Sequence, residues 1–183
     1  GFTAVQTAAE IAHDLKMAIH GHRAMHAAFT RNEKHGISFL FLAKLMRIAG
    51  IDNLHIGTVI GKLEGKKDEV LATKELVTQE EVEEIENLRL HQKWYHIKSI
   101  LPVASGGLHP GILPELFDIY GTTNIVIQIG GGIYGHPLGI EAGAKAVMQA
   151  IEAYKQGISL EEYAETHKEL KVALETWGRE KPK

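Results

Sequence analysis

The sequence predicts an α/β protein with a parallel sheet: the C-terminal half, about four βα units, of a (β/α)8 TIM barrel, followed by short C-terminal helices. Four short apolar stretches are each followed by a longer amphipathic one, which indicates βα units. Chemistry-bearing residues follow every predicted strand, as in a barrel whose active site uses the βα loops of one face. An open doubly wound sheet is the alternative.

The length of the chain limits this barrel to a part. Eight βα units take about 250 residues, whereas the chain has 183 and begins with Gly1 and a helix. A half-barrel also exposes two strand edges, which carries a risk of aggregation. We therefore expect residues 1–183 to be a single partial domain, from which an N-terminal domain and the first barrel half are absent.

The composition excludes several classes of function. The chain is 44% apolar, carries a net charge of −3 and contains no cysteine. Because there is no basic block, neither a nucleic acid nor an anionic membrane is expected as a partner. The lack of cysteine excludes disulfides and thiolate metal sites and favours a cytoplasmic location. No apolar run reaches the roughly 18 residues of a membrane span.

The first half of the chain alternates predicted helices and strands. The helix predicted over 34–49 has apolar residues at helical spacing and is stopped by Gly50. Thr3 stands where a helix cap is expected. The expected elements are a helix over 3–15, a strand over 17–21, a helix over 34–49, a strand over 52–56 and a mostly helical segment over 71–90.

The second half repeats the pattern and ends in helices. Proline at the start of two of these segments suits a first helical turn. The expected elements are a strand over 97–103, a helix over 110–120, a strand over 124–129 and helices over 137–156, 160–167 and 169–177.

The loop after the first strand is rich in histidine. His20 and His22 share one face of an extended strand, and Arg23 follows directly. A His-x-His pair at a strand end suits a metal, as in metal-dependent hydrolases. The neighbouring Arg23 favours instead an anion site in which a neutral histidine handles a proton.

The loop after the second strand combines a histidine with a lysine. His55 ends the strand, and Lys62 lies in a segment with glycines at 57, 61 and 65. Glycine allows wide backbone excursions, so this segment is interpreted as a mobile lid carrying one cation. The alternative is a glycine-rich connector whose lysine is solvated or pairs with Glu64.

Two glycine-rich loops follow the last two strands. Ser105, Gly106 and Gly107 form the first, and 130–132 is a triple glycine before a helix. Such loops expose backbone N–H groups that hold phosphate, and barrels often bind phosphate there. Each could also be a tight turn. Together, the four strand ends predict one concave face that grips a small molecule with two anionic ends.

These motifs resemble one family. His-Arg-Ala-Met-His at 22–26, the stretch 55–65, Leu-Pro-Val-Ala-Ser-Gly-Gly at 101–107, and Gln-Ile-Gly-Gly-Gly at 128–132 with Gly-His-Pro at 135–137 resemble the large subunit of ribulose-1,5-bisphosphate carboxylase/oxygenase (RuBisCO). The resemblance runs from about Gly1 to Gly157. The short C-terminal tail and Lys-His-Gly-Ile-Ser at 34–38 are most similar to the archaeal form III branch.

The resemblance implies a lyase that fixes carbon dioxide onto ribulose 1,5-bisphosphate and yields two 3-phosphoglycerates. His22 would be a catalytic proton-transfer residue, and Lys62 would stabilise the carboxylate formed when CO₂ adds. The substrate-binding residues would be Arg23 and His55 at one phosphate, Gly107, Gly130 and Gly131 at the other, Ser105 and Gly106 along the sugar, and Gln128 and Ile129 beside them.

The resemblance also implies what this chain lacks. The family holds Mg²⁺ with a Lys-x-Asp-Glu run that does not occur here, so no metal ligand is expected in this chain. The expected partners are the N-terminal half of the same protein and further copies in a homodimer-based oligomer, and the chain alone is predicted to be inactive. The alternatives are a RuBisCO-like enolase or isomerase of a phosphorylated sugar, a non-catalytic assembly or phosphosugar-binding subunit, and a metal-dependent hydrolase that uses His20 and His22.

Overall fold

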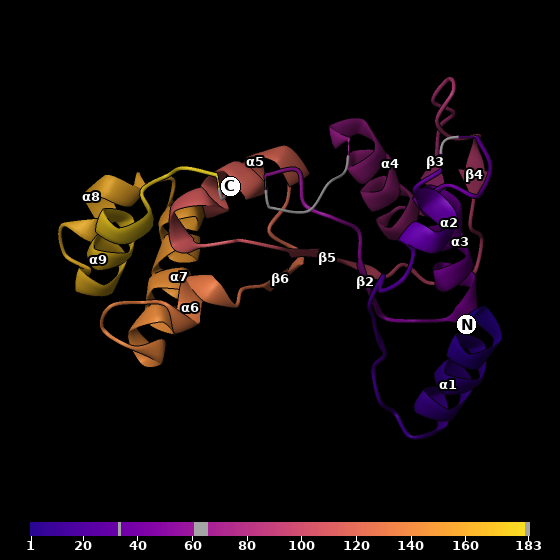
Figure 1. The fold of residues 1–183 in the computed structure, drawn as a ribbon, viewed down its shortest axis with the longest axis horizontal. Helices are drawn as coiled ribbons and strands as arrows, with labels where there is room; N and C mark the ends of the chain where they lie inside the picture. The colour runs from indigo at the N-terminus through magenta and orange to yellow at the C-terminus, as the bar shows by residue number, and fades with distance from the viewer. Residues whose placement is uncertain (33, 61–65, 182–183) are drawn as a thin grey trace. The chain divides into compact units, whose positions relative to one another are not determined.

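The computed structural model describes residues 1–32, 34–60 and 66–181 (Figure 1). They form two compact units, each of which is described by itself. Unit 1 consists of Gly1–Gly57, Gly65–Ala104 and Asn124–Val126, and unit 2 of Thr58–Glu64, Ser105–Thr123 and Ile127–Lys183. None of the helices in the described part of the chain has the length and apolar character that crossing a membrane requires.

The main sheet is the framework of unit 1. Its strands stand in the order β1 (His20–Gly21), β2 (Asn53–His55), β5 (Leu101–Ser105) and β6 (Val126–Gln128). β1 pairs in parallel with β2, and β2 pairs in parallel with β5. This pairing, with helices between the strands, confirms the predicted α/β class. β1 is shorter than the predicted strand because it has one neighbour in the sheet, and Met17 is 63% exposed.

The helices of unit 1 are α1 (Phe2–Asp14), α2 (Ala27–Thr30), α3 (Phe39–Ala49) and α4 (Lys67–Thr78). The prediction that Thr3 caps the first helix was wrong, because Gly1 takes the cap position and Thr3 lies inside the first turn. α3 begins at Phe39 rather than at residue 34, since the Ser38 hydroxyl accepts the Phe41 N–H at 3.2 Å and caps the helix there. Gly50 ends α3 in the left-handed conformation, as predicted.

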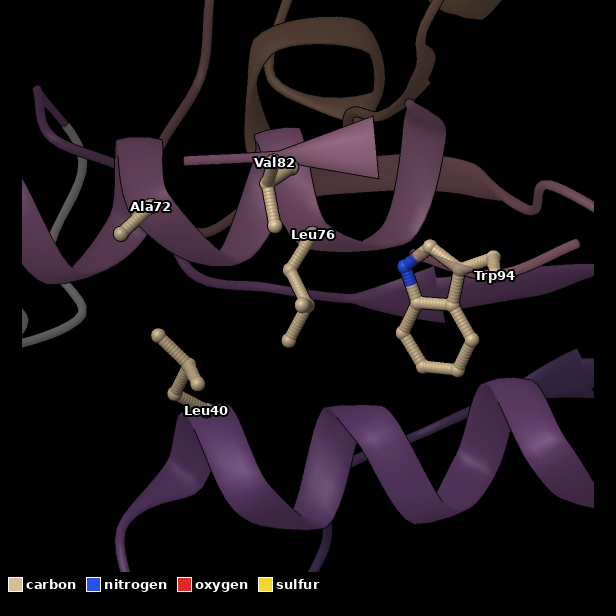
Figure 2. Packing of buried hydrophobic residues seen from close by; sticks show 5 residues of the cluster. All are labelled: Leu40, Ala72, Leu76, Val82 and Trp94. Carbon is tan, nitrogen blue, oxygen red and sulfur yellow. The ribbon is translucent and has the colours of Figure 1, made fainter. Parts of the chain in front are cut away.

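The predicted helix over 71–90 was wrong in its second half. α4 ends at Thr78, and an antiparallel hairpin follows, made of β3 (Glu81–Val82) and β4 (Gln92–Lys93). Figure 2 shows that Val82 of β3 and Trp94, directly after β4, lie in a buried cluster with side chains of α3 and α4. Their burial explains why the chain turns back. The cluster comprises Leu40, Ala72, Leu76, Val82 and Trp94. Burial of Val82 and Trp94 therefore outweighs the local preference of the acidic run for helix.

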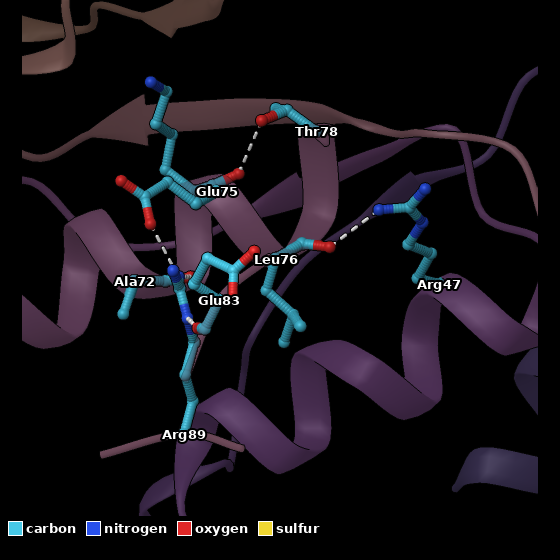
Figure 3. Close-up of polar contacts among 8 residues, drawn as sticks. Arg47, Ala72, Glu75, Leu76, Thr78, Glu83 and Arg89 are labelled. Carbon is cyan, nitrogen blue, oxygen red and sulfur yellow. Dashed lines mark hydrogen bonds and ion pairs between the residues drawn. The ribbon is translucent and has the colours of Figure 1, made fainter. Parts of the chain in front are cut away.

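Two buried arginines tie this hairpin and the following segment to the helices (Figure 3). Arg89 donates to the carbonyls of Glu83 and Ala72 and forms an ion pair with Glu75 at 2.6 Å. Arg47 donates to four carbonyls at 2.7 to 3.1 Å, those of Leu76, Gln79, Ile97 and Lys98. The bonds to Leu76 and Gln79 satisfy carbonyl groups at the end of α4, where the helix leaves its last carbonyls without partners of its own.

Unit 2 is mostly helical. Its elements are the 3-10 turn η1 (Pro110–Ile112) and the helices α5 (Leu113–Tyr120), α6 (Gly131–Tyr134), α7 (Ile140–Gln156), α8 (Leu160–Ala164) and α9 (Lys168–Trp177). The helices predicted over 110–120, 137–156, 160–167 and 169–177 are thereby confirmed with shifted ends. α9 packs against α7, α8 and η1, which places the C-terminal helix beside the segment that follows β5.

Candidate active site

The first group of predicted site residues lies at the carboxyl ends of β1 and β2 in unit 1. Parallel pairing sets Gly21 opposite Leu54, so His22 and His55 follow at the same edge of the sheet. The rings of His22 and His55 have centroids 4.6 Å apart, and Nε2 of His20 lies 2.8 Å from Nε2 of His55. We call His20, His22, Arg23 and His55 the histidine tip.

His55 is held neutral at the histidine tip. Its side chain is 2% exposed, whereas His20 and His22 are exposed. Burial, followed by the nearby charges of His22, His20 and Arg23, lowers the pKa of His55 to about 4. A neutral imidazole donates one N–H and accepts at its other nitrogen. The tip therefore holds one uncharged imidazole, that of His55, beside the permanent cation of Arg23.

Gly57 lets Arg23 reach the backbone at the end of β2. A Cβ atom at Gly57 would lie 3.2 Å from Nη1 of Arg23, and its φ of +97° also favours glycine. The guanidinium lies 5.4 Å from the ring centroid of Phe39, which anchors it from α3. The structure thus brings Arg23 and His55 to one place, as an anion site requires.

The first glycine loop, residues 105–109, lies in unit 2. Ser105 is 9% exposed, and the Thr58 hydroxyl donates to its carbonyl at 2.7 Å and accepts its N–H at 2.9 Å. Gly106 and Gly107 follow with φ of +104° and +72°, values that only glycine adopts easily in succession. Thr58 therefore fixes the point from which the loop turns outward.

The second glycine loop, residues 128–136, packs directly on the first within unit 2. A Cβ atom at Gly132 would lie 2.5 Å from the Leu108 carbonyl oxygen and 2.8 Å from Cα of His109. By contrast, the Cβ positions of Gly130 and Gly131 have no atom within 4 Å. Gln128, Gly130 and Gly131 are exposed and Ile129 is half-buried. The two loops thus form one surface with open space over adjacent glycines.

Some predicted site features lie outside these descriptions. Lys62 falls in 61–65 and so lies outside the described residues. The histidine tip belongs to unit 1 and both glycine loops belong to unit 2. The expectation that all four strand ends face one substrate stays a prediction.

The described residues do not fit a metal ion. Among them, no group of three or more His, Cys, Asp or Glu side chains has an arrangement that could hold one. At the histidine tip, the two Nε2 atoms of His20 and His55 bond each other. The metal-dependent hydrolase alternative therefore gains no support.

Sequence reasoning missed two contacts of these sites. It paired His20 with His22, on one strand face and as a possible metal-binding pair, whereas the structure pairs His20 with His55. It also passed over Thr58, which holds Ser105. The sequence offered one signal, the place of Thr58 directly after the glycine that follows a strand end. Such a place does not identify the residue that Thr58 bonds.

Comparison with known proteins gives consistent matches. Residues 1–177 match the family described as ribulose bisphosphate carboxylase large chain, catalytic domain. A ribulose bisphosphate carboxylase of Archaeoglobus fulgidus is 53% identical over 100% of this chain and 42% of its own length. The dimeric archaeal Rubisco of Hyperthermus butylicus superposes with a TM-score of 0.91 at 49% identity, over 98% of this chain and 41% of that one.

A second solved structure agrees. The octameric Rubisco of Pyrococcus horikoshii matches with a TM-score of 0.85 at 46% identity, over 97% of this chain and 40% of that one. The chain therefore spans about two fifths of the length of these relatives.

Proposed function

Because this chain belongs to the ribulose bisphosphate carboxylase large-chain family, we propose that it is the C-terminal part of a ribulose-bisphosphate carboxylase of the archaeal form III type. Together with the rest of the protein, it carboxylates ribulose 1,5-bisphosphate to two 3-phosphoglycerates. The observation that carries this proposal is the histidine tip, where a buried neutral histidine, two exposed histidines and an arginine meet at two strand ends.

His22 and Lys62 are the catalytic residues in this proposal. The ring of His22 is exposed and packs on the ring of His55. This exposure supports a proton-transfer role, because the imidazole of His22 can reach a bound substrate. Lys62 stabilises the carboxylate that forms when CO₂ adds, a charge that the bound sugar lacks beforehand.

Substrate binding divides between the two units. In unit 1, Arg23 and the neutral His55 hold one phosphate, the arginine through charge-assisted hydrogen bonds. In unit 2, Gly107, Gly130 and Gly131 hold the other phosphate through backbone N–H groups. Ser105 and Gly106 line the sugar, with Gln128 and Ile129 beside them. The exposure of Gly107, Gly130 and Gly131 supports this role.

Magnesium and the partners complete the proposal. The Mg²⁺ ligands belong to the part of the protein outside this chain. That part completes the barrel domain to which this chain belongs, and it also contains an N-terminal domain. The complete enzyme is a homodimer-based oligomer in the cytoplasm. Two relatives are described as dimeric and octameric, which supports assembly. The chain by itself is expected to have no carboxylase activity.

Complementation tests this function. The chain is mixed with a polypeptide that carries the remaining part of a form III large chain, and ribulose 1,5-bisphosphate and labelled CO₂ are supplied with Mg²⁺. We expect label in 3-phosphoglycerate from the mixture and none from either polypeptide alone.

Other outcomes identify the alternatives. An unlabelled isomer of the substrate indicates an enolase or isomerase. Sugar bisphosphate binding without turnover indicates a non-catalytic subunit. Labelled product from the chain alone contradicts the assignment of the metal ligands to the rest of the protein.

A further inference from the structure

Each glycine loop of unit 2 ends in a buried histidine. His109 comes two residues after Gly107 and is 6% exposed, and His136 comes four residues after Gly132 and is 4% exposed. The proposed function uses neither side chain. Buried imidazoles need hydrogen-bond partners, so the identity of those partners indicates what each one does.

Both histidines bond the backbone of the C-terminal segment. His109 donates its Nε2–H to the Glu180 carbonyl at 3.0 Å, and His136 donates its Nε2–H to the Glu169 carbonyl at 3.0 Å. A carbonyl oxygen only accepts, so the hydrogen is assigned to Nε2 in both rings. Nδ1 of His136 accepts the Leu138 N–H at 3.1 Å, which leaves that ring uncharged with both nitrogens engaged.

His109 is also held uncharged, by its surroundings. Its Nδ1 has no hydrogen-bond partner within the described chain, and burial lowers the pKa of the ring. The two histidines thus act as neutral hydrogen-bond donors to the beginning and the end of the C-terminal segment that contains α9.

Trp177, the last residue of α9, packs against both imidazoles. Its ring centroid lies 5.9 Å from that of His109 and 6.0 Å from that of His136. The ring also lies against the second glycine loop, since a Cβ atom at Gly135 would be 3.7 Å from its Cζ2. Directly after it, the carbonyl of Gly178 lies against Gly111 of η1. The side chain of Trp177 therefore contacts both glycine loops.

We propose that Trp177 is a positioning residue that, through His109 and His136, holds the two glycine loops together as a single anion-binding surface. The loops already touch at Gly132 and Leu108, and Trp177 adds a contact to the imidazole of each loop. That the bound anion is a substrate phosphate rests on the proposed function. The coupling of the loops rests on these contacts alone.

The consequence concerns binding rather than chemistry. Backbone N–H groups from two loops hold one phosphate well only when their separation is fixed before binding. Removal of the Trp177 ring loosens that separation and leaves the loop residues themselves unchanged. In a complemented enzyme, the loss should therefore appear mainly in KM and much less in kcat.

Hydrogen–deuterium exchange on the 183-residue chain tests the coupling. We compare the wild type with Trp177→Ala, Trp177→Phe and, as a matched control, Lys171→Gly, which weakens α9 at an exposed position six residues before Trp177. In Trp177→Ala, we expect exchange to rise roughly tenfold in both loops, 105–109 and 130–136. Trp177→Phe should keep most of the protection, and Lys171→Gly should affect α9 only.

Titration with inorganic phosphate supplies the second readout. The chain has two tryptophans, so the part of the emission change that disappears in Trp177→Phe belongs to Trp177. We expect phosphate to change Trp177 emission in the wild type and Trp177→Ala to bind phosphate about tenfold more weakly, as measured by calorimetry. If Trp177→Ala does not fold, as judged by circular dichroism, Trp177→Leu replaces it with the same expected direction.

The possible results separate the two proposals. Unchanged exchange in Trp177→Ala, or a rise in only one loop, overturns the positioning role. A rise in both loops together with a wild type that binds no phosphate supports the positioning role and contradicts phosphate binding by these loops. An equal rise in both loops in Lys171→Gly also overturns the positioning role, since it would then follow from α9 stability in general.

Discussion

The histidine tip of unit 1 and the glycine loops of unit 2 are organised in opposite ways. At the tip, side chains position one another directly, and burial of His55 beside His20, His22 and Arg23 sets its charge state. In the glycine loops, the groups proposed to bind substrate are backbone N–H groups, and side chains from elsewhere hold that backbone in place. The difference predicts that the tip responds mainly to the charge of its side chains, whereas the loops respond mainly to the space between them.

The largest effect is expected at the exposed histidine of the tip. His22→Asn keeps a polar side chain but removes the proton-transfer group, and we expect turnover of the complemented enzyme to fall by about 10²- to 10⁴-fold. His96→Asn, at another exposed histidine of unit 1, should leave turnover unchanged. An equal loss in both variants would mean that His22 has no special role.

A pH titration tests the charge state of His55 at the tip. The pKa of His55 is lowered from 6.5 to about 4, so between these values the unfolded chain binds a proton that the native chain does not. The free energy of unfolding should therefore fall by at most about 3 kcal/mol as the pH drops from 6.5 to 4. Above pH 6.5, the contribution of His55 to this free energy should be fully present.

Denaturant unfolding at several pH values measures this slope. His55→Gln should make the slope shallower, and the matched control His96→Gln should keep it. The acid sensitivity that remains in His55→Gln includes that of His109, whose pKa burial also lowers. An unchanged slope in His55→Gln would show that His55 does not contribute to the acid sensitivity.

The shape dependence of the loops is tested at Gly132. Gly132→Ala pushes a methyl group against the Leu108 carbonyl, so the loops must separate, at a cost of about 1–3 kcal/mol in unfolding free energy. Gly131→Ala is the stability control because its Cβ would point into open space. Thermal unfolding of both variants gives the comparison, and equal melting temperatures would refute close packing of the loops.

The smallest effect is expected at Thr58. Thr58→Val keeps the shape of the side chain but leaves the N–H and the carbonyl of Ser105 without the hydroxyl that bonds both. We expect a loss of about 1–2 kcal/mol in unfolding free energy. Thr176→Val, whose hydroxyl bonds one carbonyl on an exposed helix face, should change stability by much less. Chemical denaturation of the two variants decides the point.

Local chemistry made much of the fold predictable. The alternation of short apolar and longer amphipathic segments indicated the βα order, and Gly50 and Gly121 end α3 and α5 in the left-handed conformation that glycine permits. The histidines and glycines after the strands were recognisable because strand ends of a parallel sheet share an edge. These features depend on neighbours in the sequence, so the sequence by itself determined them.

Tertiary contacts decided the rest. Residues 79–90 leave the helix because Val82 and Trp94 are buried against α3 and α4 and Arg89 donates to the Ala72 carbonyl of α4. The Nε2 contact between His20 and His55, the bonds between Thr58 and Ser105, and the packing of Trp177 on His109 and His136 join residues that are 35 or more positions apart. No local pattern encodes such pairs, because the free energy that forms them comes from burial and hydrogen bonding in the folded chain.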